Sequence, residues 1–474
     1  SVELAETSGY GSEVWMDKIH KGMKDLHPSV YLCSETQERF MWVSPPELTP
    51  IILNHYNKVF DLPGVSKGAK ASVVGKIREG GQYVVHDGEE EIVNASAKEI
   101  TRGFLYDRPF NAPRTFFSEP EPEIPNDLGE VLLEILAHEN IASREPIFEK
   151  YDKQVQGRVH VESGVSDSGV LAPFNSNDYP KEIRKVGIAL STDHNPRYSM
   201  IDPYWGGVNA VVEAMRNVAA VGATPHAVTD CLCFGNPEKP NQMWEFVEGT
   251  RGVSDACNTI TLKENPDSPT PIIAGNVSFY NESKNGSIPP SPIVSCLGKL
   301  KNIDHVLPMH FQSSGSDIIM VGERKNELGG SVYYQLLKEL GANIPKPDLI
   351  ETKDQIYAIT DCAEKALPLS CHDISDGGIA TSIAEMTFGN NIGCSVKIPG
   401  HHKDHEVLFS ETGGFLLETG KNNTEKIVQV FETYGLKTFL IGQTGGERIL
   451  LNNVIDIKVV EAKDRWENGL REKL

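Results

Sequence analysis

The chain has few of the features that mark membrane, secreted or nucleic-acid-binding proteins. No apolar run approaches the roughly 20 residues that a membrane-spanning helix needs, and the first residues contain no basic segment followed by an apolar one. Basic residues are scarce, with 45 Lys and Arg against 66 Asp and Glu and a net charge of −21. This balance argues against nonspecific binding to nucleic acids or membrane surfaces, and we expect neither as a partner.

The cysteines form no recognisable framework. Eight of them are scattered along 474 residues without a Cys-x-x-Cys motif, which favours a reduced, cytoplasmic compartment. Cys231 and Cys233 alternate in a strand-like segment and therefore share one face. Zinc would need two more ligands at suitable spacing, so we interpret the pair as small apolar residues of a strand.

The common nucleotide and hydrolase motifs are also absent. The sequence contains no phosphate-binding P-loop, no Gly-x-Gly-x-x-Gly after a strand, no Gly-x-Ser-x-Gly and no His-Glu-x-x-His. A bound nucleotide would therefore be held by a less common arrangement.

A repeated segment is present instead. "LCSETQERFMWV" (32–43) and "LFSETGGFLLE" (408–418) both place Ser-Glu-Thr beside an apolar, strand-like run. The pattern in each copy predicts strand, helix, strand: 39–43, 44–60 and 71–77 in the first, and 414–419, 422–435 and 437–446 in the second. We interpret the repeat as an internal duplication. The second copy follows a long stretch that has no equivalent before the first, so we expect the chain to be a fragment of a longer protein.

The region between the copies has a mixed α/β pattern. A Pro- and Glu-rich linker (118–127) leads to an amphipathic helix (128–141). Beyond about residue 150, the sequence predicts strands at 185–192, 226–232 and 270–275, alternating with helices at 208–222 and 243–258.

Polar clusters follow three of these strands: "STDHNPRY" with "DPYWGG", then "VTDCLCFGNPEKP", then "AGNVSFYNES". Ligand sites gather at the carboxyl ends of strands in open α/β sheets. Asp193, Asp202, Asp230 and Asn276 offer the hard oxygen ligands that Mg²⁺ prefers, and the glycine pair 206–207 could present N–H groups to an anion. The same residue types also make turns, so each cluster taken alone favours a turn.

Two further motifs carry chemical groups. Glu35 and Gln37 could hydrogen-bond a polar substrate, whereas the second copy has glycines at 413–414, so the copies differ where a ligand would be bound. We therefore expect one copy to bind substrate and the other to have a structural role. In "SCHDISDGG", His372, Asp373 and Asp376 could form a metal or acid–base cluster, but we prefer a Gly-rich turn capped by Asp.

These motifs, with "CSETQERF", "HDISDGGIA" and "FSETGG", resemble the synthetase subunit of formylglycinamide ribonucleotide amidotransferase, also called phosphoribosylformylglycinamidine synthase. This family of purine biosynthesis belongs to the aminoimidazole ribonucleotide synthetase-like superfamily, and the resemblance covers essentially the whole chain. It implies an α/β (α+β) fold in which A-type and B-type domains are duplicated in the order A1, B1, A2, B2. The implied domains are an incomplete B1 (1–115), a linker and helix (116–144), A2 (145–300) and B2 (301–474).

The resemblance also implies an ATP-dependent, amidine-forming ligase that uses ATP and Mg²⁺. The family converts formylglycinamide ribonucleotide and ammonia to formylglycinamidine ribonucleotide, with a glutaminase subunit supplying ammonia from glutamine and a small accessory subunit as a further partner. The implied ATP contacts are Asp230 and Gly275, the implied Mg²⁺ ligand is Asn276, and the implied substrate contacts are Glu35, Thr36, Gln37 and Ser278. Thr36 stands where the family commonly has Ser.

The resemblance assigns no catalytic residue to this chain. The family's catalytic His lies in the A1 and B1 portion that the sequence lacks, so we expect the chain alone to be inactive. The alternative is a non-catalytic half that binds a nucleotide and scaffolds partner subunits.

Overall fold

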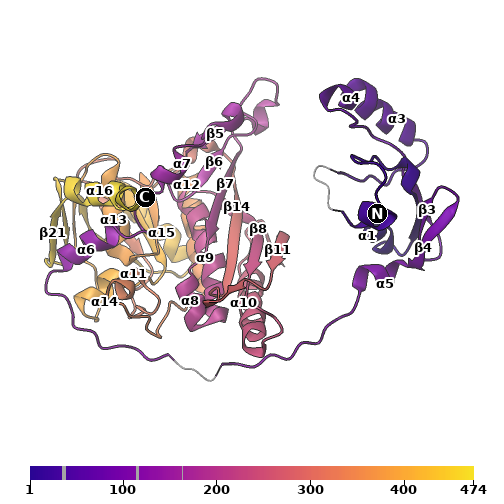
Figure 1. Ribbon diagram of the computed structural model, residues 1–474. Coiled ribbons are helices and arrows are strands. Elements are labelled where there is room, and N and C mark those ends of the chain that lie inside the picture. Colours follow the sequence, from indigo (N-terminus) through magenta and orange to yellow (C-terminus); the bar gives the residue numbers. More distant parts are fainter. Residues whose placement is uncertain (35–38, 114–116, 163) are drawn as a thin grey trace. The chain divides into compact units, whose positions relative to one another are not determined.

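The computed structural model describes residues 1–34, 39–113, 117–162 and 164–474. These residues form two compact units, Ser1–Asp107 (unit 1) and Arg108–Leu474 (unit 2), which we describe separately (Figure 1). None of the described helices is long and apolar enough to cross a membrane.

Unit 1 contains a four-stranded sheet in the order β2-β1-β3-β4. β1 pairs parallel with β3, while the pairs β1–β2 and β3–β4 are antiparallel. The fully buried apolar side chains are few, and Val14, Met16 and Val85 form the centre of its core. Its elements are α1 (Val2–Glu6), β1 (Gly11–Trp15), α2 (Pro28–Cys33), α3 (Thr49–Asn54) continued by a π-helical turn (His55–Val59), α4 (Leu62–Val65), β2 (Gly75–Arg78), β3 (Gln82–Asp87), β4 (Glu90–Ser96) and α5 (Ala97–Arg102).

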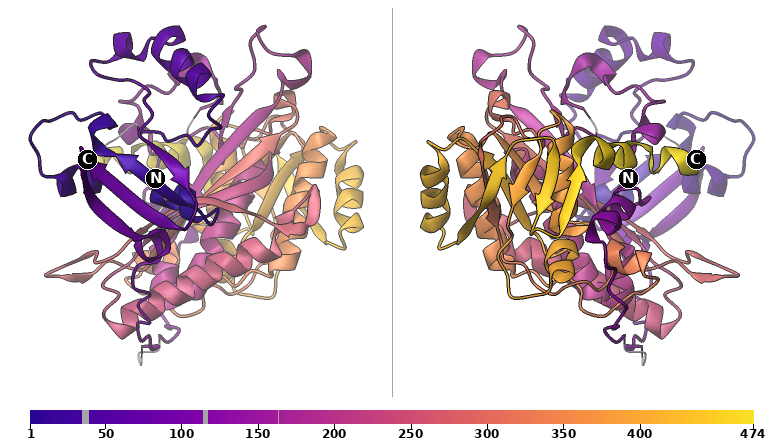
Figure 2. Two further views of the ribbon diagram at one scale, coloured as in Figure 1. Left: turned by 90° about the vertical axis from the view of Figure 1, so that its right-hand side faces the viewer. Right: turned by 90° about the vertical axis from the view of Figure 1, so that its left-hand side faces the viewer.

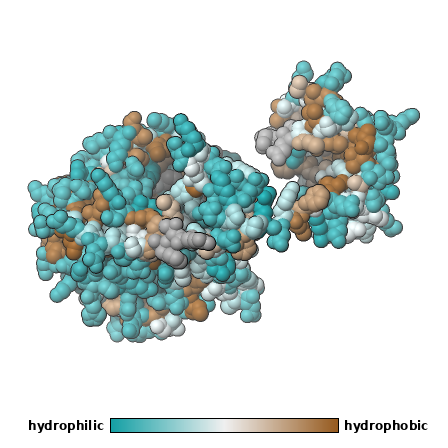
Figure 3. Space-filling view, turned by 60° about the horizontal axis from the view of Figure 1, so that its bottom comes forward, coloured by the Kyte–Doolittle hydropathy of each residue, from teal (hydrophilic) through white to brown (hydrophobic). Residues whose placement is uncertain are grey.

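One predicted strand of unit 1 is wrong. Residues 39–43 have no strand structure, and the side chains of Phe40 and Met41 are 89% and 47% exposed. Figure 3 shows apolar patches on the surface of unit 1, the smaller body in that view. The helix predicted at 44–60 is confirmed by α3 and its π-helical continuation, and the strand predicted at 71–77 forms only from Gly75 onward, as β2.

The first sheet of unit 2 has six strands in the order β11-β8-β14-β7-β6-β5. β8 and β11 are parallel, and β14 runs antiparallel to both β8 and β7. The predicted strands and helices of this region are confirmed with shifted ends. They are β5 (Val159–Val161), β6 (Gly169–Leu171), β7 (Gly187–Asp193), α8 (Pro196–Ile201), α9 (Pro203–Ala220), β8 (Thr224–Cys233), α10 (Pro240–Thr259), β11 (Ile272–Ser278) and β14 (Ser291–Leu300), with short pairs β9 (Thr261–Leu262) with β10 (Asn265–Pro269) and β12 (Glu282–Ser283) with β13 (Gly286–Ser287).

The glycine pair 206–207 lies inside α9, so the predicted anion site before that helix is wrong. A Cβ atom at Gly207 would lie 2.3 Å from the Gly249 carbonyl oxygen, and one at Gly252 would lie 2.0 Å from the Tyr204 carbonyl oxygen. The glycines of α9 and α10 therefore let the two helix backbones pack closely. The carboxylate of Asp202 accepts hydrogen bonds from the backbone N–H groups of Tyr204 and Trp205, at 3.1 and 3.3 Å, and caps α9.

The second sheet of unit 2 has seven strands in the order β16-β18-β15-β19-β17-β20-β21. The helices α9, α12 and α15 contribute to the core on one face, and α6, α13, α14 and α16 to the core on the other. In Figure 2 the sheet is orange to yellow, with α16 next to its last strands. The elements are α6 (Leu128–Leu136), α7 (Glu145–Phe148), β15 (Asp317–Val321), α11 (Val332–Leu336), α12 (Leu349–Glu364), β16 (Ser370–Ile374), α13 (Gly378–Phe388), β17 (Cys394–Val396), α14 (Asp404–Phe409), β18 (Gly414–Thr419), α15 (Thr424–Thr433), β19 (Thr438–Thr444), β20 (Arg448–Leu451), β21 (Ile455–Lys458) and α16 (Val459–Asn468).

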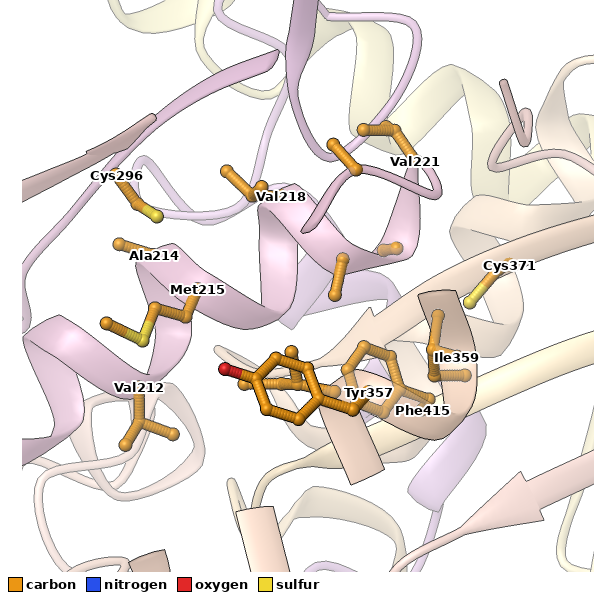
Figure 4. Packing of buried hydrophobic residues seen from close by; sticks show 14 of the residues in the cluster. Val212, Ala214, Met215, Val218, Val221, Cys296, Tyr357, Ile359, Cys371 and Phe415 are labelled. Carbon is orange, nitrogen blue, oxygen red and sulfur yellow. The ribbon is translucent and has the colours of Figure 1, made fainter. Parts of the chain in front are cut away.

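The helix α9 joins the two sheets of unit 2 through one continuous core. Figure 4 shows Met215 and Val218 of α9 close to Tyr357 of α12 and to Cys296 of β14. Phe415 of β18 belongs to the same buried cluster. Polar side chains of α9 reach both sheets, since Asn217 contacts Asp193 of β7 and Arg216 contacts Asp373 of β16. The candidate site lies there.

Candidate functional site

The register of the six-stranded sheet aligns three of the predicted residues in one row. Gly275 of β11 pairs with Asp230 of β8, Asp230 pairs with Val294 of β14, and Val294 pairs with Asp193 of β7. Adjacent strands are about 4.8 Å apart, so the Cα atoms of Asp193 and Asp230 are separated by roughly 10 Å. The two carboxylates therefore belong to neighbouring but separate places on the sheet.

The edge of this sheet holds the four residues predicted to bind ATP, Mg²⁺ and the ribonucleotide. A Cβ atom at Gly275 would lie 2.5 Å from the Asp230 carboxylate, so glycine is needed for that side chain to fit against β11. Asn276 and Ser278 alternate with Gly275 and lie on the opposite face. The structure thus brings Asp230, Gly275, Asn276 and Ser278 onto two adjacent strands but divides them between two faces.

The remaining predicted substrate contacts lie outside the described residues. Glu35, Thr36 and Gln37 are among them, and α2 ends just before them at Cys33. Their role stays a prediction.

A buried acidic cluster lies between the two sheets of unit 2. It joins Asp193 at the end of β7, Glu213 on α9, and Asp373 and Asp376 at the end of β16 and in the turn that follows. The Arg216 guanidinium, also on α9, is the cation among them: its Nε lies 3.5 Å from Asp373 Oδ2 and its Nη2 3.7 Å from Glu213 Oε2.

Amide side chains support two of these carboxylates. Asn217 Nδ2 donates to Asp193 Oδ2 at 2.9 Å, and Asn195 Nδ2 donates to Asp376 Oδ1 at 3.0 Å. Asn217 follows Glu213 by four residues on α9, so both side chains lie on the same face of the helix. α9 therefore presents a polar stripe to the cluster while its other faces pack in the apolar core.

Burial and mutual repulsion govern the charge of this cluster. Burial raises the pKa of Asp193 well above its ordinary value, and the nearby Asp376 and Asp373 raise it further. Burial and Asp193 act in the same way on the pKa of Glu213. Burial raises the pKa of Asp373 to about 6 despite the opposing effect of Arg216. A cation placed here would remove this repulsion, so the cluster favours cation binding.

A second group of ligands extends the cluster toward β6. The ligand atoms of Asp167, His372 and Asp373 lie within 4.8 Å of one another. Asp167 Oδ2 and Asp373 Oδ2 are buried and have no hydrogen-bond partner in the described structure. Buried carboxylate oxygens normally have partners, and hard oxygens are the preferred ligands of Mg²⁺. The residues present therefore fit a divalent cation such as Mg²⁺.

His372 is held in place by two carboxylates. Its Nδ1 lies 2.5 Å from Asp167 Oδ1 and its Nε2 lies 3.1 Å from Glu385 Oε2. Trp466 Nε1 donates to the other oxygen of Glu385 at 3.1 Å. Burial opposes protonation of the imidazole, but Asp167 and Glu385 raise the pKa of His372 well above its ordinary value. His372 therefore fixes the position of the Asp167 side chain, and both of its ring nitrogens are engaged by carboxylates.

Glu411, the Glu of the second Ser-Glu-Thr, lies next to this cluster and is 2% exposed. Its carboxyl group accepts hydrogen bonds from the Tyr198 hydroxyl at 2.5 Å, from the Gly377 N–H at 2.7 Å and from the Val332 N–H at 2.9 Å. These donors come from α8, from the turn before α13 and from the start of α11. The structure therefore agrees with the structural role predicted for the second copy.

Sequence reasoning found part of the acidic cluster. Asp193 was predicted as a ligand, whereas the preferred interpretation of His372, Asp373 and Asp376 as a capped turn omitted their place in the cluster. Asp167, Glu213 and Asn217 were missed. Glu213 and Asn217 stand four residues apart in the otherwise apolar helix 208–220, so they share one face of it. This spacing was the signal in the sequence that could have pointed to a polar site on that face.

Comparison with protein families identifies two domains in unit 2. Residues 167–300 match the AIR synthase related protein N-terminal domain, and residues 313–450 match the AIR synthase related protein C-terminal domain. Together these matches include the acidic cluster and both sheets except β5 and β21, with β20 only in part.

Curated relatives match the whole chain. It is 40% identical over 481 residues to the phosphoribosylformylglycinamidine synthase subunit PurL of Methanothrix thermoacetophila, covering 100% of the chain and 62% of the relative. It is 32% identical over 491 residues to the PurL subunit of Anaeromyxobacter dehalogenans, and this match covers 99% of the chain and 62% of the relative. The chain thus spans about three fifths of the length of these relatives.

Solved structures share the fold. Thermotoga maritima PurL complexed with AMPPCP matches with a TM-score of 0.61 and 21% identity, covering 94% of this chain and 62% of that one. The same protein complexed with FGAR matches with a TM-score of 0.60, and the match covers 94% of this chain and 59% of that one. The predicted fold class, with duplicated domains of the aminoimidazole ribonucleotide synthetase-like fold, is confirmed.

Proposed function

The chain belongs to the AIR synthase related protein family, in its PurL branch, and on this premise we propose that it contributes to ATP-dependent synthesis of formylglycinamidine ribonucleotide from formylglycinamide ribonucleotide and ammonia. The observation that carries this proposal is the 40% identity to a PurL subunit along the entire chain. The ammonia would come from glutamine through a separate glutaminase subunit, with a small accessory subunit as a further partner. A solved assembly of Thermotoga maritima is named PurLQS, which supports multiple subunits. The eight free cysteines agree with a cytoplasmic location.

We propose the same domain assignment as the resemblance implies: an incomplete B1 domain to about residue 115, A2 at 145–300 and B2 at 301–474. The family matches at 167–300 and 313–450 fall inside the last two ranges.

The edge of the six-stranded sheet would bind the reacting molecules. Asp230 and Gly275 would contact ATP, Asn276 would contribute to Mg²⁺ binding, and Ser278 would contact the ribonucleotide. The direct pairing of Gly275 with Asp230 supports a common ATP contact, whereas Asn276 and Ser278 lie on the other face of the two strands. Glu35, Thr36 and Gln37 of unit 1 are also proposed as contacts of the ribonucleotide.

The buried acidic cluster would hold Mg²⁺ and, through it, the phosphates of a nucleotide. A bound Mg²⁺ neutralises phosphate charge. The chain's own contribution would be to fix the ligand positions: Arg216 orients Asp373, Asn217 orients Asp193, and His372 orients Asp167. Asp167 Oδ2 and Asp373 Oδ2 accept no hydrogen bond in the described structure and would be the oxygens that face the ion, with Arg216 Nε 3.5 Å from the Asp373 oxygen.

The location of this cluster favours a second candidate function, a non-catalytic nucleotide that holds the two halves of unit 2 together. Its ligands come from β7 and α9 on one side and from the β16–α13 segment on the other. A nucleotide bound by both sides would stabilise their contact without being consumed.

Calorimetry with Mg-ADP tests the nucleotide sites. If the acidic cluster binds the nucleotide, Asp373→Asn should weaken binding at least tenfold, whereas Asp230→Ala should leave that binding event unchanged. If the sheet edge binds the nucleotide, Asp230→Ala should weaken binding at least tenfold and Asp373→Asn should leave it unchanged. Asp267→Asn, which alters an exposed carboxylate on β10, is the control. Absence of any Mg-ADP binding would contradict both sites.

An activity assay tests the enzyme proposal. The chain is supplied with formylglycinamide ribonucleotide, Mg-ATP and ammonium, and ADP release is measured. We expect no turnover by the chain alone but measurable binding of the ribonucleotide, weakened by Glu35→Gln. Turnover by the chain alone would contradict the assignment of catalysis to residues outside it, and failure to bind the ribonucleotide would contradict the proposed substrate.

A further inference from the structure

Cys231 and Cys233 lie side by side on the face of β8 that is opposite to Asp230. Their Sγ atoms are 3.6 Å apart, and both side chains are half-buried. The neighbouring strands place Asn276 of β11 and Ile293 of β14 directly beside Cys231 in the register. The pair therefore forms a small dithiol surface at the end of the sheet.

The other cysteines of the chain are arranged differently. Five are fully buried and act as small apolar residues of the two large cores, and Cys33 is exposed at the end of α2: Cys257, Cys296, Cys362, Cys371 and Cys394 are the buried ones. Burial raises the pKa of the buried thiols, for example that of Cys257 to about 12, and burial together with Cys231 also raises the pKa of Cys233. Access to solvent, rather than pKa, therefore separates the pair from the buried thiols. Cys231 and Cys233 are therefore the two cysteines whose sulfurs lie together and within reach of solvent.

The spacing of the two sulfur atoms matches that of thiolates on one metal ion. Zn–S bonds are about 2.3 Å long, so two thiolates in tetrahedral geometry lie about 3.8 Å apart. The observed 3.6 Å needs almost no rearrangement. The side-chain amide of Asn276 is 4.0 Å from Cys231 Sγ and could supply an oxygen ligand after rotation of the amide, with water in the fourth position.

We propose that Cys231 and Cys233 form a bidentate site for a soft, thiophilic metal ion of the Zn²⁺ and Cd²⁺ class. Soft thiolate ligands select such ions over Mg²⁺, so this site is chemically distinct from the acidic cluster. Binding replaces the two S–H protons, which pass to solvent, by two metal–sulfur bonds and involves no change in oxidation state.

The site would influence the sheet edge on which it lies. Cys231 contacts Asn276, and Cys233 pairs in register with Ser278. A metal held by both sulfurs would occupy the face that these two residues share, so it and the Mg²⁺ proposed at Asn276 would be alternative occupants of that face. The inference rests on the sulfur geometry alone and does not depend on the proposed enzyme activity.

Titration of the reduced, chelator-treated chain with Cd²⁺ tests the proposal through the ultraviolet sulfur-to-cadmium absorption. We expect one Cd²⁺ per chain and loss of this absorption in Cys231→Ser and in Cys233→Ser, while the matched control Cys33→Ser keeps it. Survival of the full signal in either single variant would show that the sulfurs do not act together and would overturn the proposal. Absence of the signal in the unaltered chain would do the same.

A second measurement guards against misfolding of the serine variants. Thiol counting on the unaltered chain with a thiol-reactive dye, before and after addition of Cd²⁺, should show protection of two thiols. Protection of a single thiol, or of none, would contradict a two-sulfur site.

Discussion

Unit 1 and the last hundred residues of unit 2 have the same topology. The strand order β2-β1-β3-β4 of unit 1 corresponds to β19-β17-β20-β21 of unit 2, with the same parallel and antiparallel pairings. The helices α2 and α14 have equal lengths and begin at residues 28 and 404, and each ends at the residue just before the Ser of Ser-Glu-Thr. The N–H groups of Ser34 and Ser410 both bond to the carbonyl oxygen four residues earlier.

The two regions differ in the strand after Ser-Glu-Thr. β18 lies between β16 and β15 in the seven-stranded sheet and is buried along its whole length. The corresponding residues 39–43 form no strand, and the described part of unit 1 has no counterpart of β15 or β16. The difference teaches that an apolar, strand-like sequence becomes a strand only where neighbours are available to pair with its backbone.

The largest expected effect comes from matched substitutions in these two segments. Leu416 of β18 is fully buried and Phe40, at the same position of the repeat, is 89% exposed. Leu416→Ala should lower the free energy of unfolding of unit 2 by about 3–4 kcal/mol because it leaves a cavity. Phe40→Ala should change that of unit 1 by less than about 0.5 kcal/mol. Urea denaturation measures both, and equal effects would break the comparison.

Removal of the Glu411 side chain is expected to have the next largest effect. Glu411→Ala leaves the Tyr198 hydroxyl and the N–H groups of Gly377 and Val332 without their partner, which should cost about 2–3 kcal/mol. Glu411→Gln keeps an acceptor for both N–H groups and should cost less than about 1 kcal/mol. Thermal unfolding compares the variants. An equal loss in both would argue against the hydrogen bonds as the cause.

The pH dependence of stability gives a further test of the buried Glu411 carboxyl group. Burial and the nearby Asp376 raise the pKa of Glu411 to about 8, so the native state holds a proton that the unfolded chain, with an ordinary pKa of about 4.3, releases. This contribution to stability is complete below about pH 4 and is lost as the pH rises to about 8, with a slope of up to about 1.4 kcal/mol per pH unit. Glu411→Gln should therefore show a shallower decline between pH 5 and 8. An unchanged slope would assign the decline to Asp373 and its neighbours instead.

The smallest expected effect concerns the starts of α2 and α14. Glu406 in the first turn of α14 accepts a hydrogen bond from the Lys403 N–H at 2.9 Å, whereas Val30 stands at the equivalent position of α2. Glu406→Ala should destabilise unit 2 by about 1 kcal/mol, and Val30→Ala should have less than half that effect on unit 1. Chemical denaturation can resolve this difference. A larger loss in Val30→Ala would mean that α2 is held by packing rather than by its cap.

The sequence was sufficient for features that depend on local periodicity and on the repeat. The helices α6, α9 and α10 and the strands β7, β8 and β18 formed where their patterns predicted them. Pairing between distant segments was not predictable in this way, and residues 39–43 show the consequence. The acidic cluster was found only in part for a related reason. Glu213 and Asp373 come together through the packing of α9 against β16, and Asp167 joins Asp373 from the segment before β6, which no local pattern records.

The parallel pair formed by β17 and β20 has a consequence for how the protein is made. β17 ends at residue 396 and its partner begins at residue 448, so a ribosome must release the intervening α14, β18, α15 and β19 before this ladder can close. Pairings of such long range slow folding, and until then the apolar residues of β17 stay without one of their neighbours. Synthesis of the last strands thus sets the earliest time at which the seven-stranded sheet is complete, and shortened nascent chains would be natural clients of chaperones.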